Sequence, residues 1–249
     1  ARLMRERFGL TDPRALMMRF HTQTAGSTLT AQQPENNVVR VTMQALAAVL
    51  GGTQSLHTNS MDEALSLPTE RAATVALRTQ QIIASESGVA NTVDPVAGSY
   101  FIETLTSRIE QKAREQIEAI DRMGGAVRAI EEGYVQRQIQ ESAYRYQTEI
   151  ESDERGIVGV NRYADSGGAT IPIHRLDPAL EKEQVERLRR FRAGRDTVRA
   201  RGKLDALEAA ARGADNLVPL ILDAVESGAT LGEIAGRLRA VFGAYTVVQ

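Results

Sequence analysis

Three polar segments carry the side chains most capable of chemistry in this sequence. They are His21 to Ser27, Thr53 to Asn59 followed by Ser60 and Glu63, and Asp94 to Tyr100. Their imidazole, amide, hydroxyl and carboxylate groups are suited to binding a polar ligand through hydrogen bonds. Glycine within such a segment permits a positive φ or a close approach of the backbone to a ligand.

Each segment also has a purely structural interpretation. The residues 21–27 fit a ligand-binding loop and an ordinary capped loop equally well. Ser60 and Glu63 have the spacing of a capping box, which favours a structural role for Glu63 at the start of a helix. In the alternative, Glu63 faces a ligand together with Asn59, one helical turn before it. The residues 94–100 are typical of a turn between two elements.

The common catalytic signatures do not occur. The sequence has no phosphate-binding G-x-x-x-x-G-K-[ST], no nucleophile G-x-S-x-G, no zinc-binding H-E-x-x-H and no dinucleotide-binding glycine fingerprint. The three histidines, His21, His57 and His174, are far apart, so we expect no catalytic metal held by this chain. The absence of cysteine excludes disulfides, thiolate metal sites and cysteine nucleophiles.

Short apolar runs precede the polar segments, and helical patterns follow them. We predict strands at 17–20, 53–56 and 89–93 and helices at 35–50, 60–67, 69–85 and 101–123. Strand, polar loop and helix in repetition indicate an α/β parallel sheet, and in a (β/α)8 barrel such loops form the active-site face. Three units are too few for a barrel, so we expect the others in another chain or segment.

The residues after 123 have a different pattern. We predict helices at 126–149, 178–211, 216–226 and 230–242, a strand-like run at 157–161, and a turn region at 164–172. Thr230 and Glu233 have capping-box spacing, and the charged run 180–212 is typical of a solvated helix face. The predicted domains are therefore residues 1–123, with the strand–helix units, and 124–249, a mostly helical extension.

Composition limits the class of protein. The chain of 249 residues has a formal net charge of -2, which indicates no general attraction to nucleic acid or to an anionic membrane. No stretch approaches the length of a membrane span, and the first residues lack the features of a signal peptide, so a cytoplasmic location is expected. The start at Ala1, without Met, suggests an incomplete chain.

Six strings of the sequence resemble the substrate-binding large subunit of adenosylcobalamin-dependent acyl-CoA mutases, the family that includes methylmalonyl-CoA mutase. They are RFHTQTAG (19–26), LTAQQPENNVVR (29–40), GGTQSLHTNSMDEAL (51–65), LPTERAA (67–73), VDPVAGSY (93–100) and IVGVNRY (157–163). The resemblance covers essentially the whole chain. It implies the C-terminal part of a (β/α)8 TIM barrel followed by a mostly helical extension, and an isomerase that rearranges the carbon skeleton of a CoA ester by radical chemistry.

The resemblance also implies which residues bind the cofactor. The positions matching Gly26, Glu63 and Ser66 lie at the cobalamin, where Ser66 acts through its backbone or packing. Asn59 and Glu63 hold the ribose hydroxyls of the adenosyl group, which replaces the capping interpretation of Glu63. Gln23 lines the space between the substrate and the corrin ring.

The remaining implied site residues concern the substrate. His21 lines the same space as Gln23, while Gln54 and Ser55 are further pocket residues. Methylmalonyl-CoA mutases commonly have Trp where this chain has Ser27, a form more similar to mutases with a separate large subunit. The resemblance as a whole implies a reaction of the methylmalonyl-CoA to succinyl-CoA type, and Ser27 keeps isobutyryl-CoA and 2-hydroxyisobutyryl-CoA mutases as alternatives.

The expected partners supply what this chain lacks. The family's cobalt-ligating D-x-H-x-x-G motif is absent, so the cobalt ligand is expected from another domain or a small subunit. The first half of the barrel, with the residues that select the acyl group, is expected in another chain or segment. A non-catalytic scaffold that docks a cobalamin protein is the alternative from a different functional class.

Overall fold

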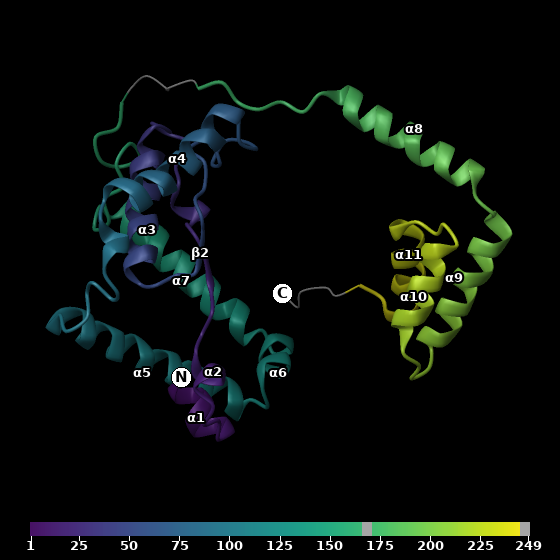
Figure 1. The fold of residues 1–249 in the computed structure, drawn as a ribbon, viewed down its shortest axis with the longest axis horizontal. Helices are drawn as coiled ribbons and strands as arrows, with labels where there is room; N and C mark the ends of the chain where they lie inside the picture. The colour runs from purple at the N-terminus through teal and green to yellow at the C-terminus, as the bar shows by residue number, and fades with distance from the viewer. Residues whose placement is uncertain (166–170, 245–249) are drawn as a thin grey trace. The chain divides into compact units, whose positions relative to one another are not determined.

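The structure is a computed structural model that describes residues 1–165 and 171–244, and it divides into two compact units, residues 1–175 and 176–249 (Figure 1). The middle of the turn region predicted at 164–172 lies outside the described residues. The domain boundary predicted after residue 123 stays a prediction. Each unit is described by itself.

A parallel strand pair forms the sheet of the first unit. The strands are β1, His21–Gln23, and β2, Ser55–His57, with His21 opposite Ser55 and Gln23 opposite His57. The helix α3, Asn36–Leu50, connects them. The strand predicted at 17–20 is wrong, since pairing begins at residue 21, and β2 overlaps only the second half of 53–56. Strand limits depend on where a partner pairs, which the apolar run does not specify.

Two helices supply most of the first unit's small core. Helix α4, Glu70–Glu86, confirms the prediction for 69–85, and Thr69 caps it by accepting a hydrogen bond from the Ala72 amide. Helix α3 confirms the prediction for 35–50 within a residue. The two helices contact one another. Their buried side chains are Val41 and Ala45 of α3 and Ala72, Ala76 and Ile83 of α4.

Two predicted elements of the first unit are wrong. Residues 60–67 form turns over 61–65 and bends at 66–67 instead of a helix. Pro68 disfavours helical backbone at Leu67, directly before it. Residues 89–93 contain the short 3-10 helix η2, Val89–Asn91, instead of a strand, after Gly88 turns the chain with a φ of 70°. The described residues therefore contain one parallel strand pair within an α/β, mostly helical fold, and they do not show a barrel fragment.

Further helices precede and follow this core in the first unit. Helix α5, Tyr100–Arg122, confirms the prediction for 101–123, while the helix predicted at 126–149 is divided at Gly133 (φ 70°) into α6, Ala126–Glu131, and α7, Tyr134–Glu151. The short helices α1, Arg2–Phe8, and α2, Pro13–Leu16, precede β1. Exposed ion pairs join α1 to α5, namely Arg2–Glu110, Arg7–Asp121 and Glu6–Arg114.

The strand-like run predicted at 157–161 is a turn held by Asn161. The Asn161 Oδ1 atom accepts from the Ile157 amide at 2.6 Å, and its Nδ2 donates to the Ile150 and Arg155 carbonyls at 3.0 and 2.8 Å. The strand-type pairing of this run is limited to one isolated bridge, between Val158 and Arg162. We call residues 157–163 the Asn161 turn.

The second unit is helical, and its last three helices pack together into a bundle. Helices α10, Leu217–Glu226, and α11, Leu231–Phe242, confirm two predictions, while the run predicted at 178–211 is divided into α8, Pro178–Gly194, and α9, Thr197–Ala211. Its core contains Leu204, Leu207, Ala224, Ala229 and Ile234. Within the described parts of the chain, no helix is both long enough and apolar enough to cross a bilayer.

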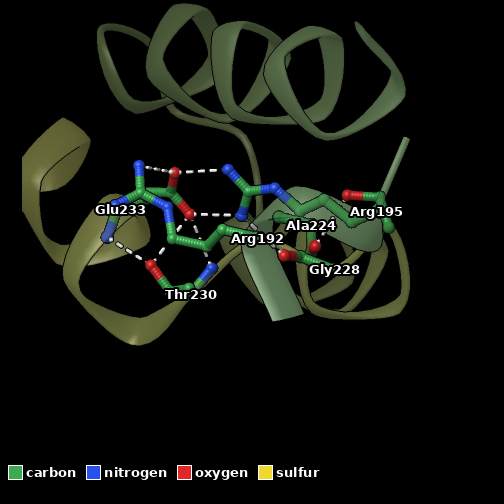
Figure 2. A network of polar contacts seen from close by, with 7 residues as sticks. Arg192, Arg195, Ala224, Gly228, Thr230 and Glu233 are labelled. Carbon is green, nitrogen blue, oxygen red and sulfur yellow. Dashed lines mark hydrogen bonds and ion pairs between the residues drawn. The ribbon is translucent and has the colours of Figure 1, made fainter. Parts of the chain in front are cut away.

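Glu233 connects two parts of this bundle (Figure 2). It completes the predicted capping box with Thr230 at the start of α11. Its carboxylate also accepts two hydrogen bonds of 2.6 Å from Arg195, between α8 and α9, and one of 3.1 Å from Arg192. The Arg195 hydrogen bond lowers the pKa of Glu233 well below its usual range, against the opposing effect of burial.

Candidate functional site

Two loops leave the carboxyl ends of the paired strands and lie side by side. We call residues 24–29 the Gly26 loop and residues 58–66 the Glu63 loop. The Thr24 amide donates to the His57 carbonyl at 3.0 Å, which continues the strand pairing by one residue. The Thr24 hydroxyl then accepts from the Asn59 amide at 2.9 Å. These two bonds fix the Gly26 loop against the Glu63 loop.

Gly26 lies directly against two side chains of the Glu63 loop. A Cβ atom at this position would lie 2.5 Å from Glu63 Oε1 and 2.8 Å from Asn59 Nδ2. The φ of Gly26 lies outside the left-handed region, so only the contact with these side chains requires glycine here. The carboxylate and the amide of two predicted site residues therefore converge over the backbone of a third.

Asn59 is buried and has one unsatisfied group. Its side chain Oδ1 accepts from Gln23 Nε2 at 3.2 Å, and only 2% of the residue is exposed. Among the described residues, the Asn59 Nδ2 group has no hydrogen-bond partner. A buried donor without a partner costs about 1–3 kcal/mol, so an acceptor on a bound molecule at this point would be stabilising.

A pocket of about 530 Å³ opens beside these residues. Gln23, Glu63 and Ser66 line it together with the polar residues His57 and Ser60. The rest of the lining is mainly apolar and includes Leu56, Leu67, Pro68, Ala73, Ala76 and Leu77. Apolar walls with a few converging polar groups are typical of a site for a small organic ligand.

The other predicted residues lie nearby in different surroundings. His21 Nδ1 and Ser55 Oγ are 2.7 Å apart across the strand pair, and His21 shares its sheet face with Gln23, two residues on. The Gln54 side chain binds backbone, accepting from the Phe20 amide and donating to the Gly52 carbonyl. The Ser66 hydroxyl donates to the neighbouring Leu67 carbonyl.

The residues that fix the Glu63 loop to α4 were missed by the sequence analysis. Asp62 is fully buried, and its Oδ2 atom accepts from the Thr69 amide at 2.9 Å and from the Thr69 hydroxyl at 3.0 Å. The Thr58 hydroxyl donates to the Ala76 carbonyl and accepts from Gln80 Nε2. Thr69 at the start of a predicted helix was a signal for a cap, but no local pattern marks Asp62 as its partner.

The Gly26 loop is held in turn by α3. Gln44 Oε1 accepts from the Ala25 amide at 2.6 Å, and Gln44 Nε2 donates to the Thr28 hydroxyl at 2.7 Å. Both loops are thus fixed by side chains of the helices that follow their strands. Such support limits the freedom of Gly26, Asn59 and Glu63 before any ligand is present.

The chemistry of this arrangement is recognition of hydroxyl groups. The Glu63 carboxylate only accepts hydrogen bonds when ionised, while the Asn59 and Gln23 amides both donate and accept. Two adjacent hydroxyls fit such a set. Over residues 1–165 and 171–244, no group of three His, Asp or Glu side chains is placed to hold a metal ion.

The family model and the similar proteins that match this chain all indicate the same family. Residues 1–244 match the family model described as methylmalonyl-CoA mutase. The chain is 46% identical to the 2-hydroxyisobutanoyl-CoA mutase large subunit of Aquincola tertiaricarbonis over 98% of this chain and 44% of that protein. It is 46% identical to the methylmalonyl-CoA mutase of Escherichia coli, over 96% and 34%, and 42% identical to the mitochondrial enzyme of Homo sapiens, over 98% and 33%. The chain thus spans less than half the length of these relatives.

Proposed function

Because the chain belongs to the methylmalonyl-CoA mutase family, we propose that it forms part of an adenosylcobalamin-dependent acyl-CoA mutase. In this proposal residues 1–123 are the last strand–helix units of a (β/α)8 barrel, and the reaction is the 1,2-rearrangement of a CoA-ester carbon skeleton. The observation that carries the proposal is the convergence of Asn59 and Glu63 over Gly26, beyond the carboxyl ends of parallel strands. That edge of a parallel sheet is where active sites of barrel enzymes lie.

The residues present fit the sugar of an adenosyl group. Glu63 offers an acceptor and the unpartnered Asn59 Nδ2 offers a donor, both over a glycine that leaves room for them. The pair suits the two neighbouring hydroxyls of a ribose. The apolar walls of the adjoining pocket suit a flat ring system.

The cofactor, when bound, supplies the radical chemistry of the rearrangement. The chain's own residues hold the reacting groups in position. Glu63 accepts a hydrogen bond from one ribose hydroxyl, and Asn59 donates one to the other. Orientation of this kind accounts for a large part of catalysis, because it replaces the entropy loss of a chance encounter.

Gln23 and His21 act on the substrate side in this proposal. Gln23 already binds Asn59 Oδ1, so it connects the ribose site to the strand face that carries His21. The contact of His21 with Ser55 supports this role because it fixes the orientation of the imidazole ring. Gln54 supports the same strand start through the Phe20 amide.

Identity to the relatives does not choose the acyl group. The 46% figure is shared by a 2-hydroxyisobutanoyl-CoA mutase subunit and by a methylmalonyl-CoA mutase. We propose a methylmalonyl-CoA to succinyl-CoA type of reaction, with isobutyryl-CoA and 2-hydroxyisobutyryl-CoA as the alternatives that Ser27 favours. The first barrel half and the cobalt ligand come from a preceding segment or a companion chain and from a cobalamin-binding domain or small subunit.

A parallel activity assay tests this proposal. The full-length protein with its companion chains is incubated with adenosylcobalamin and, separately, with methylmalonyl-CoA, isobutyryl-CoA and 2-hydroxyisobutyryl-CoA. We expect isomerisation of one of these esters, dependent on the cofactor. Binding of the cobalamin protein without turnover of any ester would instead identify a non-catalytic scaffold.

A further inference from the structure

The Asn161 turn packs against the beginning of α3, although more than a hundred residues separate them in the chain. Gln33 Nε2 donates to the Tyr163 carbonyl at 2.9 Å. Gly159 has a φ of 82°, and the position of a Cβ on it lies 3.1 Å from the Gln33 side chain. Through both contacts the turn packs against Gln33, in the segment directly before α3.

Arg40 of α3 joins this turn to the interior. The Arg40 Nη2 group donates to the Val158 carbonyl at 2.7 Å. The Nη1 group donates to Asn37 Oδ1 at 2.8 Å and to the Thr30 hydroxyl at 3.0 Å. All three acceptors are uncharged, and within the described ranges Arg40 makes no ion pair. Its hydrogen bonds are nonetheless strengthened by the guanidinium charge.

Asn37 carries the connection to the site. It is fully buried, and its Nδ2 group donates to the Thr30 carbonyl at 2.9 Å and to the Met61 carbonyl at 2.8 Å. Its Oδ1 atom accepts from the Thr30 amide at 3.1 Å as well as from Arg40. All hydrogen-bonding positions of this amide are occupied, so its orientation is determined.

The Met61 carbonyl belongs to the Glu63 loop, between Asn59 and Glu63. We infer that Arg40 is a positioning residue, through which the Asn161 turn holds the Asn59–Glu63 pair in place. The connection runs from the Val158 carbonyl to Arg40, from Arg40 to Asn37, and from Asn37 to the Met61 carbonyl. The IVGVNRY segment therefore acts as a brace for the site. This inference rests on the proposed function of Glu63.

The first test measures backbone exchange in the protein without cofactor. Full-length protein with its companion chains is compared with Arg40→Met, which keeps an unbranched apolar side chain and removes the guanidinium donors. Amides of residues 58–66 are expected to exchange about tenfold faster in the variant, the factor for loss of the one charge-assisted hydrogen bond to Asn37 that leads to the loop. Asn161→Ala removes the side chain that holds the turn together, and it is expected to accelerate exchange of the same amides.

A double-mutant cycle gives the second test. Arg40→Met is expected to lower kcat about tenfold, with the KM for the CoA ester within about twofold. In a Glu63→Gln background the same change is expected to lower kcat less than about twofold further, because its effect passes through Glu63. Arg71→Met, at an exposed arginine of α4, is the matched control and should change neither exchange nor kcat.

The possible results distinguish the positioning role of Arg40 from the proposed role of Glu63. A lower melting temperature without faster exchange at 58–66, or equal losses of kcat in both backgrounds, would overturn the positioning role and leave a general stabilising one. If Glu63→Gln alone leaves turnover unchanged, the proposed role of Glu63 fails, and the exchange data still decide whether Arg40 holds the loop. If Arg40→Met does not fold, the Asn161→Ala variant supplies the exchange comparison.

Discussion

Substitution of Gly26 by alanine tests the convergence of the two site loops. The new Cβ would lie 2.5 Å from Glu63 Oε1 and 3.2 Å from Glu63 Cδ. Favourable non-bonded separations are about 3.5–4.0 Å, so the Glu63 carboxylate must move by roughly 1 Å. Asn59 Nδ2, at 2.8 Å, must move as well, but it belongs to a residue that is 2% exposed and has little room.

Catalysis should suffer more than folding in Gly26→Ala. A displacement of about 1 Å at a positioning group lowers the rate about 10²-fold, so kcat is expected to fall by about that factor. The exposed Glu63 side chain can rotate away at small cost, while crowding of Asn59 costs about 1–3 kcal/mol. The KM for the CoA ester is expected to change little, because the proposed role of Gly26 is on the adenosyl side of the site.

Steady-state kinetics of the assembled full-length enzyme check this prediction, with the melting temperature measured in parallel. Gly51→Ala is the control, since a Cβ there meets its nearest atom, the Ala47 carbonyl oxygen, at an ordinary 3.4 Å. A Gly26→Ala enzyme with kcat within about twofold of the wild type would refute the reasoning. It would mean that Glu63 and Asn59 need not occupy the space above Gly26 during turnover.

Two further predictions concern stability. Glu233→Gln should lower the free energy of unfolding by about 1–3 kcal/mol, because Arg195 loses its charged partner, while the exposed Glu226→Gln serves as control in thermal melts. The pKa of Glu233 in the folded protein is lowered from 4.5, so the stability that its carboxylate contributes is present above about pH 4.5 and is lost as the pH falls below it. The melting temperatures of Glu233→Gln and wild type should therefore converge in acid. An equal difference in melting temperature at pH 3 and pH 7 would contradict the assignment. Asp62→Ala should cost about 1–3 kcal/mol and loosen the Glu63 loop, because the Thr69 amide and hydroxyl lose their acceptor; unchanged exchange of residues 58–66 would show that Asp62 does not anchor it.

Local patterns in the sequence predicted the longer helices well. The apolar spacing of α4 and α5 and the capping box at Thr230 are encoded within a few neighbouring residues, and the structure confirms them. Helix breaks at Gly133 and at Arg195 were missed, because a charged helical pattern continues across both positions. The strands were misplaced because their limits depend on pairing with a distant partner.

The site was predictable only in part for the same reason. Gly26, Asn59 and Glu63 were named from their resemblance to a family, and the spacing of Ser60 and Glu63 alone favoured a cap that the structure does not form. The supporting residues Asp62 and Asn37 left no local signal. Their hydrogen bonds reach partners 7 and 24 positions away, so only the folded chain shows which side chains hold the loop.

The most direct test of the central claim is the effect of Glu63→Ala on turnover and on CoA-ester binding in the assembled enzyme. If this chain supplies the adenosyl side of the site, kcat should fall by about 10²-fold or more, while the dissociation constant of the CoA ester stays within about twofold. Turnover equal to that of the wild type would contradict the claim. A loss confined to CoA-ester binding would place Glu63 on the substrate side instead.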